Sequence, residues 1–502
     1  MTSLFETMIE TFATVLEPSR ILFMVLGVFI GLTIGFLPGL SGTVGMSLLL
    51  PFVFGMDPAT GIALLIGMMA VLHSGDTFPS VLLGIPGSSG SQATIMDGYP
   101  LAQKGQAVRA LGAAFFCSMV GGVIGGLILF LVIPLLRPLV LLFGSPELFM
   151  LALLGLSFVG ILAGKRPILG ILAGLVGMLL GTVGTAPAVP EYRYTFDSLY
   201  LYNGIQLPLV ALGLFAFPVL IDLLASNESI SRGAKLTGSW VQGIKDSIKN
   251  KWLVVRSAVL GASIGFIPGL GGSVVDWISY GISKQTSENP ENFGKGDIRG
   301  VIAPESANNA KEGGTLIPTL MFGIPGSGTT AILLGGLILM GIESGPRMVT
   351  DDLPITMSII WTLIIANIIG VIACLSLTKP IAWFSTVHPT KLVPFITIII
   401  VVGAFQTTQH WGDILLFLAL GIVGWIMKQL DWPRAPILIG FVLAMSAERY
   451  LWISFSHYGV EWLTRPGVIV IALLCIVVVI SSLLQSKKKQ SMTQTNDSGV
   501  KS

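Results

Sequence analysis

A twelve-residue segment near the start of the chain recurs in its second half. Residues 31–42 read GLTIGFLPGLSG, and residues 261–272 read GASIGFIPGLGG. A second motif follows each copy with the same internal spacing, at these matched positions: Gly75 with Gly314, Pro79 with Pro318, and the sequence GIPGS at 84–88 and 323–327. Paired interruptions at corresponding places in two apolar halves are typical of secondary transporters, where they form the binding site.

The composition indicates that the chain folds in lipid. Hydrophobic residues make up 53% of its 502 residues and charged residues 11%, whereas a soluble chain carries about 25% charged residues. Apolar runs long enough to cross a bilayer recur along the chain and do not alternate as β-barrel strands do. We predict an all-α polytopic integral membrane protein with roughly 10–12 transmembrane helices plus re-entrant or broken helices, arranged as two inverted repeats.

The distribution of charge predicts the orientation of the chain. Six lysine and arginine residues lie between 226 and 256, and three more lie at 487–489. The positive-inside rule assigns both segments to the cytoplasm. Because residues 1–20 carry three glutamates and one arginine, the N-terminus is predicted to be periplasmic and the C-terminus cytoplasmic. The first half would then cross the membrane an odd number of times, which would invert the second half.

These features divide the chain into five segments. They are an amphipathic N-terminal helix at 1–20, a first transmembrane repeat at 21–224, a cytoplasmic polar linker at 225–251, a second transmembrane repeat at 252–484 and a disordered cytoplasmic tail at 485–502. The second repeat carries an extra polar insert, 284–299, which we expect to be an exposed loop. The net charge of +2 gives no indication of a nucleic-acid partner.

The GIPGS motif is predicted to end one helix and start another, with Ser88 as a cap, because proline and glycine break helices. Backbone groups freed inside a membrane must face protein or a wet cavity. The new helix would present amide donors and its positive dipole end there. Such donors suit a carboxylate held without a full positive charge; the alternative is a simple helix kink. The expected substrate-binding residues are Pro86, Gly87, Ser88, Ser89, Pro325, Gly326, Ser327 and Thr329.

The earlier PGLSG and PGLGG motifs should break helices in the same way and leave carbonyl groups free to bind Na⁺. Close packing of glycines between helices is the alternative. Asp76, beside the second motif, is a further candidate to ligate Na⁺ or carry a proton, with an interfacial capping role left open. The other expected cation-site residues are Pro38, Gly39, Ser41, Thr43, Pro268, Gly269 and Ser273.

The most polar stretch beside a motif is 304–314, PESANNAKEGG. Its proline suits the start of a helix, and Asn308 and Asn309 could donate to a carboxylate or coordinate a cation. A solvated loop continuing the insert is the alternative. Later in the chain, Glu448 and Arg449 are expected to pair with each other.

Other classes of protein find less support. No phosphate-binding GxxxxGK[ST] motif occurs, so an ATP-driven pump is excluded. An anion channel remains open, because interrupted helices also line pores. An intramembrane serine protease is suggested only by GSSG at 87–90, and no later histidine lies in a small-residue packing motif. We therefore expect no catalytic residues, no enzyme activity and inert packing for the three cysteines.

The motifs IGFLPGLSG at 34–42, APESANNA at 303–310 and both copies of GIPGS resemble the TctA family, the large membrane subunit of bacterial tripartite tricarboxylate transporters. The resemblance covers nearly the whole chain. It implies secondary transport of citrate or a related tricarboxylate or dicarboxylate, with Na⁺ as coupling ion and no other cofactor. It also implies a location in the bacterial inner membrane and two partners, a small four-helix membrane subunit and a periplasmic solute-binding protein.

Overall fold

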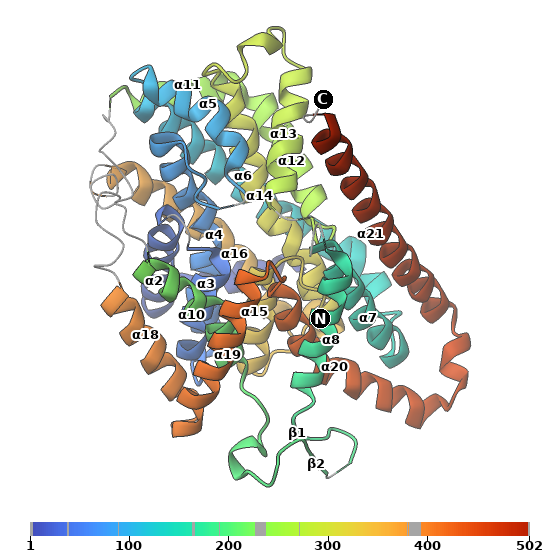
Figure 1. Ribbon diagram of the computed structural model, residues 1–502. Coiled ribbons are helices and arrows are strands. Elements are labelled where there is room, and N and C mark those ends of the chain that lie inside the picture. The colour runs from blue at the N-terminus through green and yellow to red at the C-terminus, as the bar shows by residue number, and fades with distance from the viewer. Residues whose placement is uncertain are drawn as a thin grey trace.

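Nearly all of the chain that the structure describes is α-helical. The computed structural model describes residues 4–37, 40–88, 90–162, 166–189, 191–225, 237–270, 272–378, 380 and 393–499. One antiparallel hairpin, β1 (Gly184–Thr185) with β2 (Tyr192–Arg193), protrudes at one end of the molecule. At the other end lie α5 (Gln92–Gln103), α11 (Trp240–Lys249) and α13 (Gly272–Gln285) (Figure 1).

Seven helical segments in the described part of the chain are long and apolar enough to cross a membrane. They are α2 (Pro18–Phe36), α4 (Pro58–Leu83), α6 (Ala107–Val140), the continuous run of α9 (Leu207–Ala211), η3 (Leu212–Ala216) and α10 (Phe217–Ala225), α16 (Leu353–Ser376), α19 (Trp411–Gln429) and α20 (Ala435–Tyr458). Shorter apolar helices accompany them: α3 (Gly42–Leu49), α7 (Ser145–Leu162), α8 (Pro167–Gly181), α15 (Gly328–Leu339), α18 (Val393–Gln406) and the first part of α21 (Pro466–Gly499). The predicted all-α, multi-pass membrane architecture is confirmed.

Among the remaining helices, α14 (Arg299–Phe322) is central and the others connect or cover these segments. The others are α1 (Leu4–Val15), η1 (Leu50–Val53), η2 (Leu199–Leu201), α12 (Lys251–Gly265), η4 (Pro290–Asn292), η5 (Pro346–Val349) and η7 (Glu461–Thr464). Helix α1 lies on α16, where the Trp361 indole donates to the Met8 carbonyl at 2.8 Å. Its Phe5 and Ile9 side chains are exposed, so an apolar face remains available to lipid.

Two helices, α4 and α14, form the centre of the molecule. From Gly61 to Leu82 and from Gly300 to Met321, every residue of these helices is buried. Helix α2 packs on α4 and α12 packs on α14. In addition, α6 from the first half packs on α14, and α16 from the second half packs on α4. Each half therefore contributes one helix to the surroundings of the other half's central helix.

Small residues set the same packing register in both halves. At four positions that match between the halves, a glycine lies directly against a backbone carbonyl oxygen of the central helix, and any side chain there would overlap that oxygen. The contacts are Gly31 with Met68 and Gly35 with Leu72 in the first half, and Gly261 with Ala307 and Gly265 with Lys311 in the second. Met68 and Ala307 are 239 residues apart, as are Leu72 and Lys311, and the same interval separates the two GIPGS motifs. The glycine contacts therefore recur at matched positions, and the two halves are built on one internal plan.

Both central helices end at the GIPGS motif as predicted. Helix α4 stops at Leu83 and α14 at Phe322, and the following Gly84 and Gly323 adopt left-handed backbone angles, with φ of 68° and 65°. Only glycine adopts this conformation without a steric penalty. The next helices then start at different points. Helix α15 begins directly after Ser327.

The start of α5 differs from the prediction. Ser91, rather than Ser88, precedes its first residue, Gln92, and makes no side-chain capping bond. The Ser88 hydroxyl instead donates to the Asp76 carboxylate and accepts the Gly90 amide at 3.2 Å. At the equivalent place in the second half, the Ser327 side chain and Thr330 form a reciprocal capping box. The helix after the break is therefore capped by the preceding side chain in the second half and not in the first.

One further expectation is wrong. The stretch 304–314 is neither a solvated loop nor the start of a helix, because α14 begins at Arg299 and contains Pro304. The polar side chains are accommodated by hydrogen bonding to neighbouring helices. At the other end of the chain, α21 extends to Gly499, and the disorder expected for 485–502 stays a prediction.

Candidate substrate site

The four helix breaks meet in two pairs, and each pair joins the two halves. A methyl group placed on Gly272 would lie 3.1 Å from Gly90 Cα. Likewise, a methyl group on Gly42 would lie 3.2 Å from Thr329 Oγ1. The first break of each half therefore packs against the second break of the other half. Neither contact could be inferred from the motifs, because both are between segments more than 180 residues apart.

The two meeting points differ in chemistry, and we name them accordingly. The charged crossing consists of Ser88, Gly90, Gly272, Asn308 and Lys311. The neutral crossing consists of Gly42, Thr43, Leu72, Gly328 and Thr329. Lys311 and Leu72 hold equivalent positions on the two central helices. Lys311 lies against Gly272, and Leu72 lies against Gly42, the matching glycine at the first break of the other half.

Lys311 brings a full positive charge to the charged crossing. Its Nζ would lie 3.5 Å from a methyl group on Gly272, and its side chain is only 6% exposed. A buried ammonium requires a partner, and Glu312 Oε1 lies 2.8 Å from it. The sequence analysis expected an anion held without a full positive charge, so this lysine changes the expected chemistry of the site.

His73 and Glu312 meet between the two central helices. Nε2 of His73 lies 2.9 Å from Glu312 Oε1 and 3.3 Å from Lys311 Nζ. His73 and Glu312 are separated by 239 residues, the interval that also separates the matched glycines Gly84 and Gly323. The charged cluster therefore brings together matched positions of the two halves.

Asp76 connects this cluster to the first GIPGS break. Its Oδ2 lies 3.3 Å from His73 Nδ1 and accepts the Ser88 hydroxyl, while its Oδ1 is buried without a partner. Asp76 itself is fully buried in the interior of α4 and caps no helix end. The carboxylate lies between the serine and the histidine, whereas a serine protease requires the histidine in the middle. These three residues therefore do not have the order of a serine protease triad.

Glu305 fixes the helix that follows the break. Its buried carboxylate accepts three hydroxyl groups, from Thr94 on α5 at 2.8 Å, Ser118 on α6 at 2.9 Å and Thr77 on α4 at 3.0 Å. Three hydroxyl donors offset much of the cost of burying this charge. Glu305 thus ties α4, α5 and α6 to α14 directly beside the charged crossing.

The N-terminus of α5 is already occupied by a carboxylate of the chain. Asp276, on α13, accepts the Ala93 amide at 2.6 Å, and its other oxygen is buried without a partner. The Ser327–Thr330 capping box likewise pairs the Thr330 amide at the start of α15. One amide donor in the first turn of each helix is therefore already bound within the chain.

The predicted amide residues both lie in the centre. Asn308 donates to the Gly90 carbonyl at 2.5 Å, so it belongs to the charged crossing. Asn309 donates to the side chains of Asn367 at 2.9 Å and Ser74 at 3.3 Å. The side-chain oxygen of each asparagine is buried and has no hydrogen-bond partner, which leaves two acceptors free for a cation or a donor group.

The other predicted substrate residues lie around the second breaks. Gly87 is buried against Asp76, Gly326 is buried near Thr315, and Thr329 belongs to the neutral crossing. Pro86 is exposed, whereas Pro325 is buried. Ser89 lies outside the described residues.

The predicted Na⁺ residues are only partly placed. Pro38 and Gly39 lie outside the described residues, as does the side chain of Ser273. Pro268 and Gly269 are buried, and the Gly269 amide donates to the Gly326 carbonyl at 3.2 Å, so the two breaks of the second half touch. The hydroxyls of Ser41 and Thr43 are hydrogen bonded to each other at 2.6 Å. Among the described residues, no group of three or more His, Cys, Asp or Glu side chains is placed to hold a metal ion.

The insert is clamped to α5 by a residue that sequence reasoning did not single out. Asp97 Oδ1 accepts the amides of Gly294, Gly296 and Asp297 at 2.7–2.9 Å. Its other oxygen accepts the Tyr280 hydroxyl at 2.9 Å. The insert is present only in the second half, so this clamp restrains the helix of the charged crossing and has no equivalent at the neutral one.

Sequence reasoning assigned no role to His73, Glu305, Lys311 or Glu312, and did not name Asp276. A signal for part of the cluster was present: the interval between the GIPGS motifs places a histidine and a glutamate at equivalent positions. The expected pairing of Glu448 with Arg449 is wrong. Glu448 binds both terminal nitrogens of Arg193 at 2.8 Å, because successive residues of a helix point in different directions.

Comparison with known proteins identifies the family. The chain matches the family described as "Tripartite tricarboxylate transporter TctA family" over residues 21–439. It is 33% identical, over 440 residues and 88% of each chain, to an "Uncharacterized 52.8 kDa protein in TAR-I ttuC' 3'region" of Agrobacterium vitis. An "Uncharacterized protein in TAR-II ttuC' 3'region" of the same species is 35% identical over 191 residues, 38% of this chain and 79% of that protein. No solved structure matches the chain. The chain therefore belongs to the tripartite tricarboxylate transporter TctA family.

Proposed function

We propose that this chain is the large membrane subunit of a Na⁺-coupled secondary transporter that imports citrate or a related tricarboxylate or dicarboxylate. The single observation that carries the proposal is the charged crossing. There, two helix breaks from different halves meet beside a buried lysine, where matched residues of the two halves also touch. Membership of the family supports the general class of transport.

The carboxylate would bind at the charged crossing. Lys311 supplies the charge that a carboxylate anion requires, and Ser88 and Asn308 supply polar groups on opposite sides. In the absence of substrate, Glu312 neutralises the lysine at 2.8 Å. A substrate carboxylate would share or replace this partner, so that the lysine is never left uncompensated in a low-dielectric interior.

Na⁺ would bind near the first breaks, where unwound backbone offers carbonyl oxygens. Binding a cation offsets the remaining negative charge of the substrate, so the fully loaded site can cross a low-dielectric barrier that the half-loaded site cannot. The contact between Gly269 and Gly326 supports such coupling, because it links the two kinds of break directly. Movement of the loaded site, rather than opening of a pore, would give alternating access.

The proposal includes the two partners and the location expected for the family. A periplasmic solute-binding protein would deliver the carboxylate, and a small four-helix membrane subunit would accompany the chain in the bacterial inner membrane. Helix α11, which carries Lys245 and Lys249, lies at the end opposite the β-hairpin (Figure 1). The positive-inside rule then makes the hairpin end periplasmic and the end near α11 cytoplasmic, together with the C-terminus.

Reconstitution in liposomes tests this function. The chain, its small subunit and its binding protein would be assembled, and uptake of labelled citrate would be measured with and without an inward Na⁺ gradient. We expect accumulation above the external concentration only with the gradient and the binding protein. Rapid equilibration without any cation gradient would support an anion channel instead and would contradict the proposal.

A further inference from the structure

One arginine lines two neighbouring cavities. A small cavity of about 60 Å³ lies between the C-terminal ends of α14 and α15, the middle of α20 and the first part of α7, and a larger pocket of about 440 Å³ opens beside the β1–β2 hairpin. Arg449, on α20, contributes to the walls of both. Pro187 and Ala188, between the two strands, form part of the larger pocket. The arginine therefore stands between an open pocket and a closed one.

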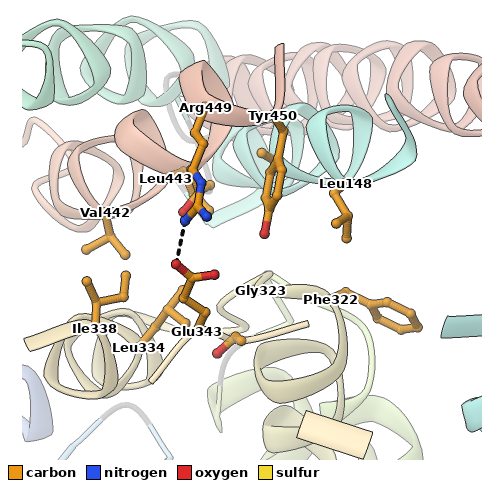
Figure 2. A pocket seen from close by; sticks show the side chains of 13 residues that line it. Leu148, Phe322, Gly323, Leu334, Ile338, Glu343, Val442, Leu443, Arg449 and Tyr450 are labelled. Atoms are coloured by element: carbon orange, nitrogen blue, oxygen red, sulfur yellow. Dashed lines mark hydrogen bonds and ion pairs between the residues drawn. The ribbon is translucent and has the colours of Figure 1, made fainter. Parts of the chain in front are cut away.

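A carboxylate on the opposite wall holds this arginine. Nη1 of Arg449 donates to Oε1 of Glu343 at 2.5 Å, and Figure 2 shows the two side chains facing each other across the small cavity. Glu343 lies in the loop that follows α15. The two side chains are 53% and 45% exposed. Ion pairs this exposed contribute little to stability, so the partner of the arginine can change at small cost to the fold.

The small cavity leads to the second break of the second half. Gly323, the left-handed residue that ends α14, lines it. The Tyr450 side chain points into the same space (Figure 2), and the Ser344 hydroxyl is buried there without a hydrogen-bond partner. A guanidinium group and two hydroxyl groups form a set of donors suited to a carboxylate.

We propose that Arg449, Tyr450 and Ser344 form an access site for the carboxylate substrate, and that Glu343 closes it when substrate is absent. This inference rests on the proposed carboxylate transport. The incoming carboxylate replaces Glu343 on the guanidinium group, so one carboxylate–arginine pair is exchanged for another. The released loop after α15 then opens the cavity toward Gly323.

The size of the cavity is consistent with such an opening. A volume of about 60 Å³ holds only a few water molecules, and the Glu343–Arg449 ion pair crosses it, so separation of the pair would make room for a tricarboxylate. The site also lies at the hairpin end of the molecule (Figure 1), the end that the proposed orientation assigns to the periplasm. A carboxylate released by a periplasmic protein would meet this arginine before it reaches the charged crossing.

Uptake kinetics of the reconstituted complex test the access site. In Arg449→Gln we expect the half-saturating citrate concentration to rise about tenfold, the loss of one charge-assisted contact, with the maximal rate reduced by less than about twofold. In Glu343→Gln, which frees the arginine, we expect the half-saturating concentration to fall about threefold. Tyr450→Phe should raise it about threefold while keeping the ring in place.

Arg347→Gln provides a matched control. Arg347 is 54% exposed, pairs with Asp352, and lines neither cavity, so its replacement should leave uptake unchanged. Opposite shifts for the arginine and glutamate variants would support an exchange site. Equal losses in both variants would show that Arg449 and Glu343 are only a structural pair, and no change in either would show that the pair has no part in uptake. Both results would overturn the access site. Failure of the unaltered complex to take up any carboxylate would instead overturn the proposed function, and this inference with it.

Discussion

The charged and neutral crossings share a backbone plan and differ in side chains. In both, a first-break glycine packs against the central helix of its own half and the second break of the other half. The charged crossing has Lys311 where the neutral crossing has Leu72, and polar Asn308 one turn earlier. Duplication therefore supplies the scaffold, and a few substitutions on one side supply the chemistry.

This difference indicates a division of labour between the crossings. A buried lysine with its glutamate is costly to fold unless it has a role, because well-packed apolar residues are often as stable. Leu72 at the equivalent position shows that the scaffold accepts an apolar residue there. We therefore expect the charged crossing to bind substrate and the neutral crossing to serve packing and movement.

The largest effect is expected from removing the charge. Lys311→Leu should reduce citrate uptake by about 100-fold or more, because it removes the counter-charge and leaves Glu312 with His73 alone; breaking a buried pair costs about 3–5 kcal/mol. The matched change Leu72→Met in the neutral crossing should keep uptake within about twofold. Initial rates per reconstituted complex give the comparison. Equal loss in both variants would show that the two crossings are not specialised.

The second effect concerns the glycines of the two GIPGS motifs. A methyl group on Gly87 would lie 2.7 Å from Asp76 Cα, whereas one on Gly326 would lie 3.3 Å from a Thr315 methyl group. Gly87→Ala should therefore lower uptake about 30-fold, through a backbone overlap worth about 2 kcal/mol. Gly326→Ala should lower it less than about threefold. Uptake would be normalised to purified, monodisperse complex. A larger loss in Gly326→Ala than in Gly87→Ala would contradict the assignment of the substrate site to the charged crossing.

A smaller effect is expected from Asn308. Asn308→Leu removes the hydrogen bond to the Gly90 carbonyl but keeps a similar volume, so the half-saturating citrate concentration should rise about fivefold. Met69, the equivalent residue beside the neutral crossing, offers the control: Met69→Leu should change it less than about twofold. Concentration series for both variants would separate binding from maximal rate. If the half-saturating citrate concentration were unchanged in Asn308→Leu, Asn308 would not belong to the substrate site.

The smallest effect concerns the insert, which only the second half carries. Burial opposes ionisation of Asp297, but hydrogen bonds and charge from Arg299 hold its pKa below the ordinary value. The stabilisation is thus complete above the ordinary carboxyl pKa and is lost as the pH falls through the lowered value. Because the pair is partly exposed, it amounts to about 1 kcal/mol or less. Hydrogen exchange of 286–298 should show protection falling more as the pH is lowered in the unaltered chain than in Asp297→Asn, because both chains keep the Asp97 clamp and only the unaltered chain has the Asp297–Arg299 pair to lose.

The sequence predicted the scaffold better than the chemistry. Apolar runs and the repeated Pro-Gly motifs are local signals, so the helices and the ends of α4 and α14 could be predicted. The pairing of breaks across the halves could not, because it depends on contacts such as Gly272 with Gly90. Lys311 was assigned no role for the same reason. In the sequence it lies between the polar insert and the second GIPGS motif, and only the structure shows that its helix, α14, is central and that the lysine is buried.

A structure of the complex with citrate and Na⁺, determined by electron cryomicroscopy, would test the central claim most directly. We predict density for a carboxylate beside Lys311, between Gly90 and Gly272, with Glu312 displaced or sharing the ammonium group. Citrate density at the neutral crossing, beside Leu72 and Thr329, with Lys311 still fully paired to Glu312, would contradict it.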